Sequence, residues 1–256
     1  MHYSICNAQQ TKIDSLKFCV TKAKNDTNKI NALNSLSSQL WQLGKYKEAN
    51  EFAEKTLALC EKLETISKLK WGKGSVKALT NIGIVHYYLG NYPQALQNYF
   101  SALKIAENTN YKIGIADSYN NIGLVYERQK NYEDALTKQL ESLKIRLMIG
   151  DSLTIGDSYN NVGIIYEEKG DYANAKLNYI NALSIRTRIK DEWGIGGTLH
   201  NLGKLCINQG EFEESFNYLM ASLKIQESHE DDQASCRSRS SGRSYDCSHY
   251  SGPYQS

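Results

Sequence analysis

The chain has 256 residues, of which 41% are hydrophobic and 23% charged, the composition of a folded globular protein rather than of a disordered chain. Its 30 basic and 28 acidic residues leave a net charge of +2, so no excess of positive charge predicts binding to nucleic acid or to an anionic membrane. The six cysteines show neither a C-x-x-C pair nor a histidine-cysteine cluster at ligand spacing, and we expect no metal, no cofactor and no disulfide framework.

The two prolines, Pro93 and Pro253, leave long stretches of helix-forming residues uninterrupted, which predicts an all-α architecture. No apolar run approaches the ~20 residues that a membrane-spanning helix requires, so we expect a soluble protein without membrane insertion. Residues 4–10 resemble the end of a bacterial secretion signal but lack the charged and apolar regions that precede such an end. The cytoplasm is the favoured compartment, and the bacterial periplasm is the alternative if a signal peptide lies upstream.

The N-terminal segment, residues 1–29, carries apolar side chains at helical spacing from about Thr11 to Lys24. Ile13, Leu16 and Val20 are among them. We expect a helix there that caps the exposed end of the first repeat.

Residues 30–75 predict a first helical hairpin. Leucines from Leu33 to Leu40 recur at helical spacing, a Gly-Lys-Tyr sequence breaks the helix, and a second apolar stripe follows. The stretch at 64–75 contains lysines and glycines and is expected to be a loop, with its Gly-Lys-Gly-Ser segment at 72–75 acting as a flexible connector.

One phrase returns through the chain at a fixed spacing. Residues 118–126 read SYNNIGLVY and residues 158–166 read SYNNVGIIY. The glycine of this phrase recurs every 40 residues, a period typical of stacked repeat units. Its copies are Gly83, Gly123, Gly163 and Gly203. We expect five repeats at about 30–75, 76–115, 116–155, 156–195 and 196–228, with added residues in the connections at 108–115 and 150–155.

The second repeat has the most specific pattern, with a large apolar residue ahead of Gly83, then Gly90, an aromatic residue at Tyr92 and a small one at Ala95. This pattern resembles the tetratricopeptide repeat and covers residues 30–228. The resemblance implies an all-α, right-handed superhelical solenoid of antiparallel helical hairpins, whose first helices line the concave surface. The 40-residue period is similar to that of kinesin light chain, of G-protein-signalling modulators and of repeat arrays in bacterial signalling proteins.

The repeated small residues indicate how the helices pack. Gly83 is small where two antiparallel helices would approach closely, and Tyr99 helps to fill the space between them. Gly90 is expected to end its helix in the left-handed conformation. Lys130 and Ser215 depart from the glycine and alanine of the pattern, which weakens those two sites locally.

Beyond residue 228 the composition turns rich in serine, with interspersed arginine, glycine and tyrosine, so the tail at 229–256 is expected to be disordered. The helix before it carries apolar residues with no following helix to cover them, and solenoids normally cap such a face. This end is therefore a candidate surface for a partner or for self-association. Its apolar residues are Phe216, Leu219, Met220 and Leu223.

Asparagine occurs two residues before each repeated glycine, and stacking would set these side chains one above another. An amide offers both a donor and an acceptor, so such a ladder can hold the backbone of an extended peptide. The alternative is that each amide bonds the neighbouring helix and sets the repeat geometry. The four residues are Asn81, Asn121, Asn161 and Asn201.

Further groove candidates lie on the same predicted helices, and their slightly acidic character in the third and fourth repeats favours a peptide with basic residues. For any single residue, a solvated charge is the alternative. These candidates are Tyr87, Tyr88, Asn120, Glu127, Arg128, Asn160, Glu167, Glu168, His200 and Lys204.

No catalytic constellation is found in the sequence. His86 and Cys206 occupy the slot of Tyr126 and Tyr166, an aromatic packing position, and lie three repeats apart, so core packing is expected of them. The sequence therefore predicts a non-catalytic scaffold that binds a peptide or protein segment in its groove. The alternative is a sensory or regulatory module of a bacterial signalling protein that lacks its kinase, cyclase or transcription-regulator output domain.

Overall fold

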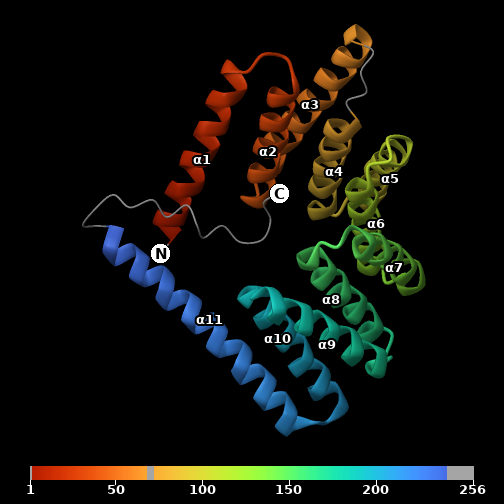
Figure 1. The fold of residues 1–256 in the computed structure, drawn as a ribbon, viewed down its shortest axis with the longest axis vertical. Coiled ribbons are helices and arrows are strands. Elements are labelled where there is room, and N and C mark those ends of the chain that lie inside the picture. Colours follow the sequence, from red (N-terminus) through yellow and green to blue (C-terminus); the bar gives the residue numbers. More distant parts are fainter. Residues whose placement is uncertain (1, 68–71, 241–256) are drawn as a thin grey trace. The chain divides into compact units, whose positions relative to one another are not determined.

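The computed structural model describes residues 2–67 and 72–240, and every regular element in these ranges is an α-helix, which confirms the predicted class. The chain forms two compact units, one ending at Ile145 and one beginning at Arg146. Figure 1 labels the helices along the chain. No described helix is long and apolar enough to cross a membrane. The helices are α1 (His2–Lys22), α2 (Thr27–Gln42), α3 (Tyr46–Ser67), α4 (Gly72–Tyr88), α5 (Tyr92–Asn108), α6 (Lys112–Arg128), α7 (Tyr132–Ile149), α8 (Ser152–Glu168), α9 (Tyr172–Ile189), α10 (Glu192–Gln209) and α11 (Phe212–Ser240).

The repeat period comes from the length of the helices. From α4 to α10 each helix has 17 or 18 residues, and only short turns connect them. Two such helices with their turns fill the 40 residues between successive glycines. The prediction that the added residues lie in connections at 108–115 and 150–155 is wrong, because most of these residues belong to helices.

The predicted loop at 64–75 is also wrong for its described residues. Helix α3 continues to Ser67 and α4 begins at Gly72, so the expected flexible connector is the first turn of a helix. A Cβ on Gly74 would lie 2.6 Å from Cγ2 of Ile30 and 3.1 Å from Sγ of Cys60. Glycine is used here because it lets α4 approach α2 and α3 closely.

Each first helix of a repeat is followed by one residue in the left-handed conformation, the usual way to end a helix. The third repeat has Lys130 at this place, with φ 59°. A side chain crowds the following carbonyl in this conformation, so Lys130 carries ~1 kcal/mol of strain that a glycine would not. The prediction for Gly90 is confirmed, since its φ is 76°. The equivalent glycines are Gly44, Gly170 and Gly210.

The two helices of a hairpin approach closely at the repeated glycine, as predicted. A Cβ on Gly83 would overlap the ring of Tyr99, which is 2% exposed. Gly163 and Tyr179 make the same contact, where a Cβ would lie 2.6 Å from Cε1. The large buried residue of the second helix therefore fills the space that the glycine leaves.

Later repeats accommodate polar residues in these packing positions. Gln139 replaces the tyrosine and is fully buried; its Nε2 donates to the carbonyl oxygen of Asn120 at 3.1 Å. Ser215 occupies the alanine position, where it is buried and donates to the carbonyl oxygen of Gly203 at 2.9 Å. Oγ of Ser215 and Nε2 of Gln139 thus find hydrogen-bond partners, whereas Oε1 of Gln139 is buried without one among the described residues.

Helix α1 packs against α2 in the N-terminal unit. Ile13 is 1% exposed and lies in a core cluster with Leu36 and Leu40. The helix begins at His2, earlier than the expected start at Thr11. The side of the first hairpin that α2 presents to α1 is thus covered by apolar residues of α1.

Helix α11 differs from the other second helices because it continues to Ser240. The predicted tail boundary at residue 228 lies within this helix, and residues 241–256 are outside the described part of the chain. Leu219, expected on the uncovered face, instead packs on α10: a Cβ on Gly203 would lie 2.6 Å from its Cγ. The inner side of α11 is therefore occupied, and its outer side is considered below.

Candidate functional site

In each unit the first helices of the repeats carry a polar side, which we call the first-helix face of that unit. On α6 it contains Asn120, Asn121, Glu127 and Arg128, which share a side of the helix because the second pair follows the first by seven residues, or about two helical turns. The same positions recur on α4, α8 and α10. Within the N-terminal unit α4 contacts α2 and α6, and within the C-terminal unit α8 contacts α10, so the first helices of each unit lie side by side.

Asn81 is a structural member of the predicted ladder. It is 5% exposed, its Nδ2 donates to the carbonyl oxygen of Asn34 at 3.2 Å, and its Oδ1 accepts from Oγ of Ser38 at 3.1 Å. Both ends of the amide thus bond to α2. For Asn81 the alternative role, fixing one repeat on the preceding one, accounts for the side chain.

Asn121 occupies the equivalent position on α6 in a different environment. It is half-buried, and Oδ1 accepts from Nδ2 of Asn120 at 3.4 Å, at the long end of the hydrogen-bond range. Nδ2 of Asn121 has no hydrogen bond within the described residues, and it is not among their buried, unpartnered atoms. This amide can therefore donate to a ligand and still accept from one.

A polar contact links the C-terminal ends of α4 and α6. Arg128 is exposed and donates from Nε to Oη of Tyr87 at 2.9 Å, and this bond raises the pKa of the guanidinium. Tyr88, 55% exposed, stacks on Trp41 and Tyr46 with ring centroids 5.9 Å and 5.8 Å apart. The N-terminal unit thus places a cation beside a partly exposed group of aromatic rings.

In the C-terminal unit, Asn201 repeats the interhelical pattern. Its Nδ2 donates to Oδ1 of Asn160 at 3.0 Å, which joins α10 to α8. Asn161 is half-buried on α8, while His200 and Lys204 are exposed on α10. The ladder in this unit is therefore partly engaged in holding the two first helices together.

Glu167 lies at the C-terminal end of the same face. Its Oε2 accepts from Oη of Tyr179 at 2.7 Å and its Oε1 accepts from Nδ2 of Asn208 at 3.2 Å. Asn208 to Glu167 and Arg128 to Tyr87 join equivalent positions of successive first helices. Polar bonds at the ends of the first helices thus recur in both units.

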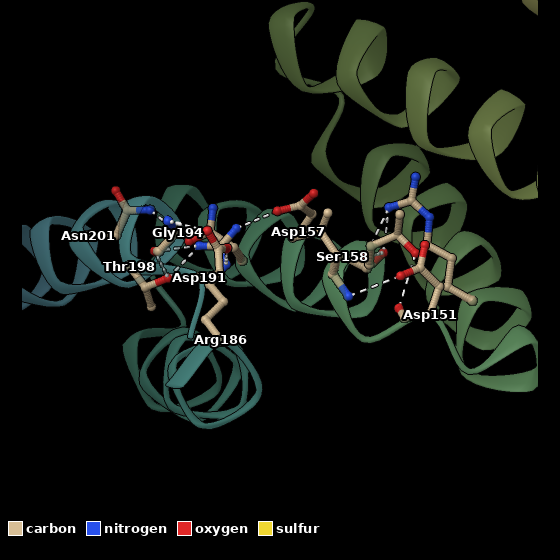
Figure 2. A network of polar contacts seen from close by, with 12 residues as sticks. Asp151, Asp157, Ser158, Arg186, Asp191, Gly194, Thr198 and Asn201 are labelled. Atoms are coloured by element: carbon tan, nitrogen blue, oxygen red, sulfur yellow. Dashed lines mark hydrogen bonds and ion pairs between the residues drawn. The ribbon is translucent and has the colours of Figure 1, made fainter. Parts of the chain in front are cut away.

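The sequence analysis missed a pair of buried arginines. Arg186 on α9 is 7% exposed; its Nη1 donates to the carbonyl oxygen of Gly194 at 2.9 Å and to Oγ1 of Thr198 at 2.5 Å, and its Nη2 donates to Oδ1 of Asp157 at 2.5 Å. Figure 2 shows this guanidinium among residues of α8 and α10. Arg186 therefore ties three helices together and holds an acidic residue of the first-helix face.

Arg146 makes the equivalent contacts one repeat earlier. It is also 7% exposed, and its Nη1 donates to the carbonyl oxygen of Thr154 at 3.2 Å and to Oγ of Ser158 at 2.8 Å. The sequence contained a sign of these contacts, since each arginine is followed twelve positions later by a hydroxyl residue, as in Arg186 and Thr198. An arginine and a hydroxyl residue that recur at this spacing one repeat apart indicate a hydrogen bond between successive helices.

One cluster in the C-terminal unit has metal-ligand types. Ligand atoms of Cys206, Glu211 and Glu214 lie within 4.8 Å of one another. Lys176 Nζ, however, lies 3.3 Å from Glu211 and 3.2 Å from Glu214 and lowers the pKa of Glu214, while burial raises the pKa of the Cys206 thiol. The lysine supplies the positive charge that these carboxylates face, and a protonated thiol is a poor metal ligand.

Comparisons with known proteins place the chain among repeat proteins. A family model described as tetratricopeptide repeat matches residues 75–148 and 154–228, and a second model of the same description matches residues 30–64. A search of curated proteins found no match.

Solved structures resemble the fold. The structure of BtubC (BKLC) from P. vanneervenii has a TM-score of 0.72 and 17% identity, over 97% of this chain and 98% of that one. Nearly identical TPR-like repeats of kinesin light chain type from Podosopora anserina give 0.60 and 15%, over 77% and 94%. A Rap conjugation gene regulator in complex with a Phr peptide gives 0.63 and 17%, over 80% of this chain and 56% of that one.

Proposed function

The chain belongs to the tetratricopeptide repeat family, and from this premise we propose that it is a non-catalytic scaffold that binds an extended peptide or protein segment along the first-helix face. The observation that carries the proposal is the amide of Asn121, which is half-buried and retains an unbonded donor. One amide can donate to a peptide carbonyl and accept from a peptide N–H, so it grips main chain whatever the ligand sequence.

The surroundings of Asn121 suit a peptide with basic residues. Glu127 is half-buried near the C-terminal end of the same helix, α6. A carboxylate beside a binding face steers a positively charged partner and selects against an acidic one more than it adds affinity. Arg128, bonded to Tyr87, follows Glu127 directly and offsets part of this preference.

The structural relatives support the same class of ligand. The Rap regulator was solved with a Phr peptide bound, so a fold of this kind accommodates a peptide. At 17% identity the likeness extends to the fold and does not transfer individual residues. The proposal for this chain therefore rests on its own first-helix face.

The test compares wild type, Asn121→Ala and a matched control, Asn98→Ala, against an array of short unstructured peptides of varied sequence. Asn98 is an asparagine on the second helix α5, where its Nδ2 bonds only its own helix at Gln94. We expect Asn121→Ala to weaken binding about tenfold across the bound peptides, as expected for losing one or two hydrogen bonds, and Asn98→Ala to bind as wild type does. If folded Asn121→Ala binds the peptides as tightly as wild type does, the Asn121 amide does not bind them. If the wild type binds no peptide, the proposed peptide-binding function is wrong.

A regulatory module is the second candidate function, and one observation favours it. Phe212 and Phe216 on α11 are 71% and 64% exposed, so the chain offers an apolar surface apart from the first-helix face. A module of this kind would act through α11. Loss of partner capture on substitution of Phe216, with binding by Asn121→Ala unchanged, would favour this function over the first.

A further inference from the structure

The outer side of α11 carries an unusual apolar stripe. Phe212, Phe216, Met220 and Leu223 are 71%, 64%, 48% and 44% exposed, and their spacing of four, four and three residues sets them along one side of the helix. A shallow hollow of about 490 Å³ is lined by Met220, Leu223 and their neighbours. We refer to these four residues as the α11 stripe.

Comparison with α9, the second helix of the preceding repeat, shows which kind of element covers the equivalent residues. One repeat earlier, Tyr172 and Leu183 of α9 pack against a core cluster that includes Leu202 and Leu205 of α10, the first helix of the next hairpin. The corresponding residues of α11, 40 positions on, are Phe212 and Leu223. Helix α11 continues to Ser240 without the turn that ends α9, so no later helix of the described chain covers the stripe.

Apolar residues at the position of Phe216 are covered by another element elsewhere in the chain. Leu96 of α5, three repeats earlier, packs against the core cluster that includes Ile122 and Val125 of α6, whereas α9 has Lys176 at this position, which bridges Glu211 and Glu214. An exposed aromatic residue here is therefore typical of a surface that a partner covers.

We propose that the occupant is the α11 stripe of a second copy of this chain, packed antiparallel in a two-fold symmetric dimer. A two-fold interface requires a self-complementary surface, and an antiparallel crossing near residue 218 sets Phe212 opposite Leu223 and Phe216 opposite Met220. The aromatic residues of each copy then pack against the aliphatic residues of the other.

Charge selects the antiparallel orientation over the parallel one. Glu213 lies at the N-terminal end of the stripe and Lys224 at the other end, both exposed and on the same flank of the helix. Antiparallel packing brings Glu213 of each copy beside Lys224 of the other, twice by symmetry. In a parallel two-fold pair the charged flanks of the two copies would lie on opposite sides of the interface, so this pairing of opposite charges would be lost.

The dimer rests on α11 and is independent of the proposed peptide binding, so either can fail alone. Sedimentation velocity of the full chain over a concentration series should give a mass near twice 28.9 kDa. Phe216→Glu should weaken dimerisation by about 100-fold or more, as for a buried aromatic anchor. The matched control Leu177→Glu removes a leucine that is 55% exposed on α9, off the stripe, and should dimerise as wild type does.

Charge reversal tests the orientation. Glu213→Lys and Lys224→Glu should each weaken the dimer about fivefold, and the double variant should restore it; circular dichroism verifies that each variant is folded. A wild type that stays monomeric throughout the series, or a dimer unaffected by Phe216→Glu, would overturn the proposal. Single reversals without effect, or a double variant weaker than either single one, would overturn the antiparallel arrangement.

Discussion

The guanidinium of Arg186 donates to Oγ1 of Thr198 at 2.5 Å and so joins α9 to the first helix of the following repeat. The same guanidinium bonds Asp157 and lies 3.7 Å from Asp191. Two carboxylates and a buried hydroxyl thus depend on a single side chain. Buried polar networks of this kind favour one arrangement of the helices, and removing one member is costly.

Arg186→Met should lower the free energy of unfolding by ~3 kcal/mol, because it removes the cation and leaves Asp191, Asp157 and Thr198 without it. Urea denaturation followed by circular dichroism measures the loss. The control is Arg188→Met, an exposed arginine two positions away on the same helix, which should change stability by less than ~0.5 kcal/mol. Equal stabilities of the two variants would show that the network contributes nothing.

Gly83→Ala should destabilise the chain by ~2 kcal/mol or more, because the new Cβ would overlap the ring of Tyr99, which is buried in close-packed surroundings. Gly197 is also a helical glycine, but a Cβ there meets nothing within 4 Å. Gly197→Ala should therefore stabilise the chain by up to ~1 kcal/mol through helix propensity. Thermal unfolding of both variants checks the opposite signs, and shifts of the same sign would contradict the packing argument.

Lys130→Gly should raise the free energy of unfolding by ~0.5 to 1 kcal/mol, because it removes the strain of a left-handed lysine at φ 59°. The greater conformational entropy of glycine in the unfolded state offsets part of this gain. The neighbouring Gln129 has φ −81°, so Gln129→Gly relieves no strain and should be destabilising. Chemical denaturation of the pair distinguishes the two effects. A Lys130→Gly variant less stable than wild type would contradict the assignment of strain.

Asp171 makes stability depend on pH at the acid end. Hydrogen bonds from the side chain and backbone of Asn174 lower the pKa of this carboxyl below its ordinary value, because they favour the charged form. The stabilisation is present above the unfolded-state pKa, about 3.9, and is lost as pH falls through the lower folded-state pKa. Stability measured against pH should show this loss in wild type, and the loss should be smaller in Asp171→Asn.

Sequence periodicity predicts the helices of this chain well because each repeat packs its two helices through the same sequence positions. The 40-residue spacing of the glycines and the apolar stripes around them correspond to the helical hairpins observed. The loop predicted at 64–75 from its lysines and glycines is wrong for the described residues of that stretch. Gly74 is needed instead for contact with Ile30 and Cys60, and such long-range crowding has no local signal.

The sequence predicts where the repeated asparagines lie, but it does not predict which of their amides are already hydrogen-bonded within the protein. Asn81 and Asn121 hold the same place in the repeat, yet Asn81 is buried between Asn34 and Ser38 of α2, while Asn121 has only a long bond to its neighbour Asn120. The difference comes from the side chains of the preceding helix, which periodicity alone does not compare. Whether a repeated asparagine can bond a ligand therefore depends on which side chains the preceding first helix places beside it.

The 17-residue first helices also set a length scale for any ligand. At 1.5 Å per residue such a helix is ~25 Å long, the span of seven or eight residues of extended chain. Packed helices lie ~10 Å apart, which is about three extended residues. A ligand that runs along one helix would therefore contact a single repeat, whereas a ligand that crosses the first helices of one unit would meet one ladder position for about every three of its residues.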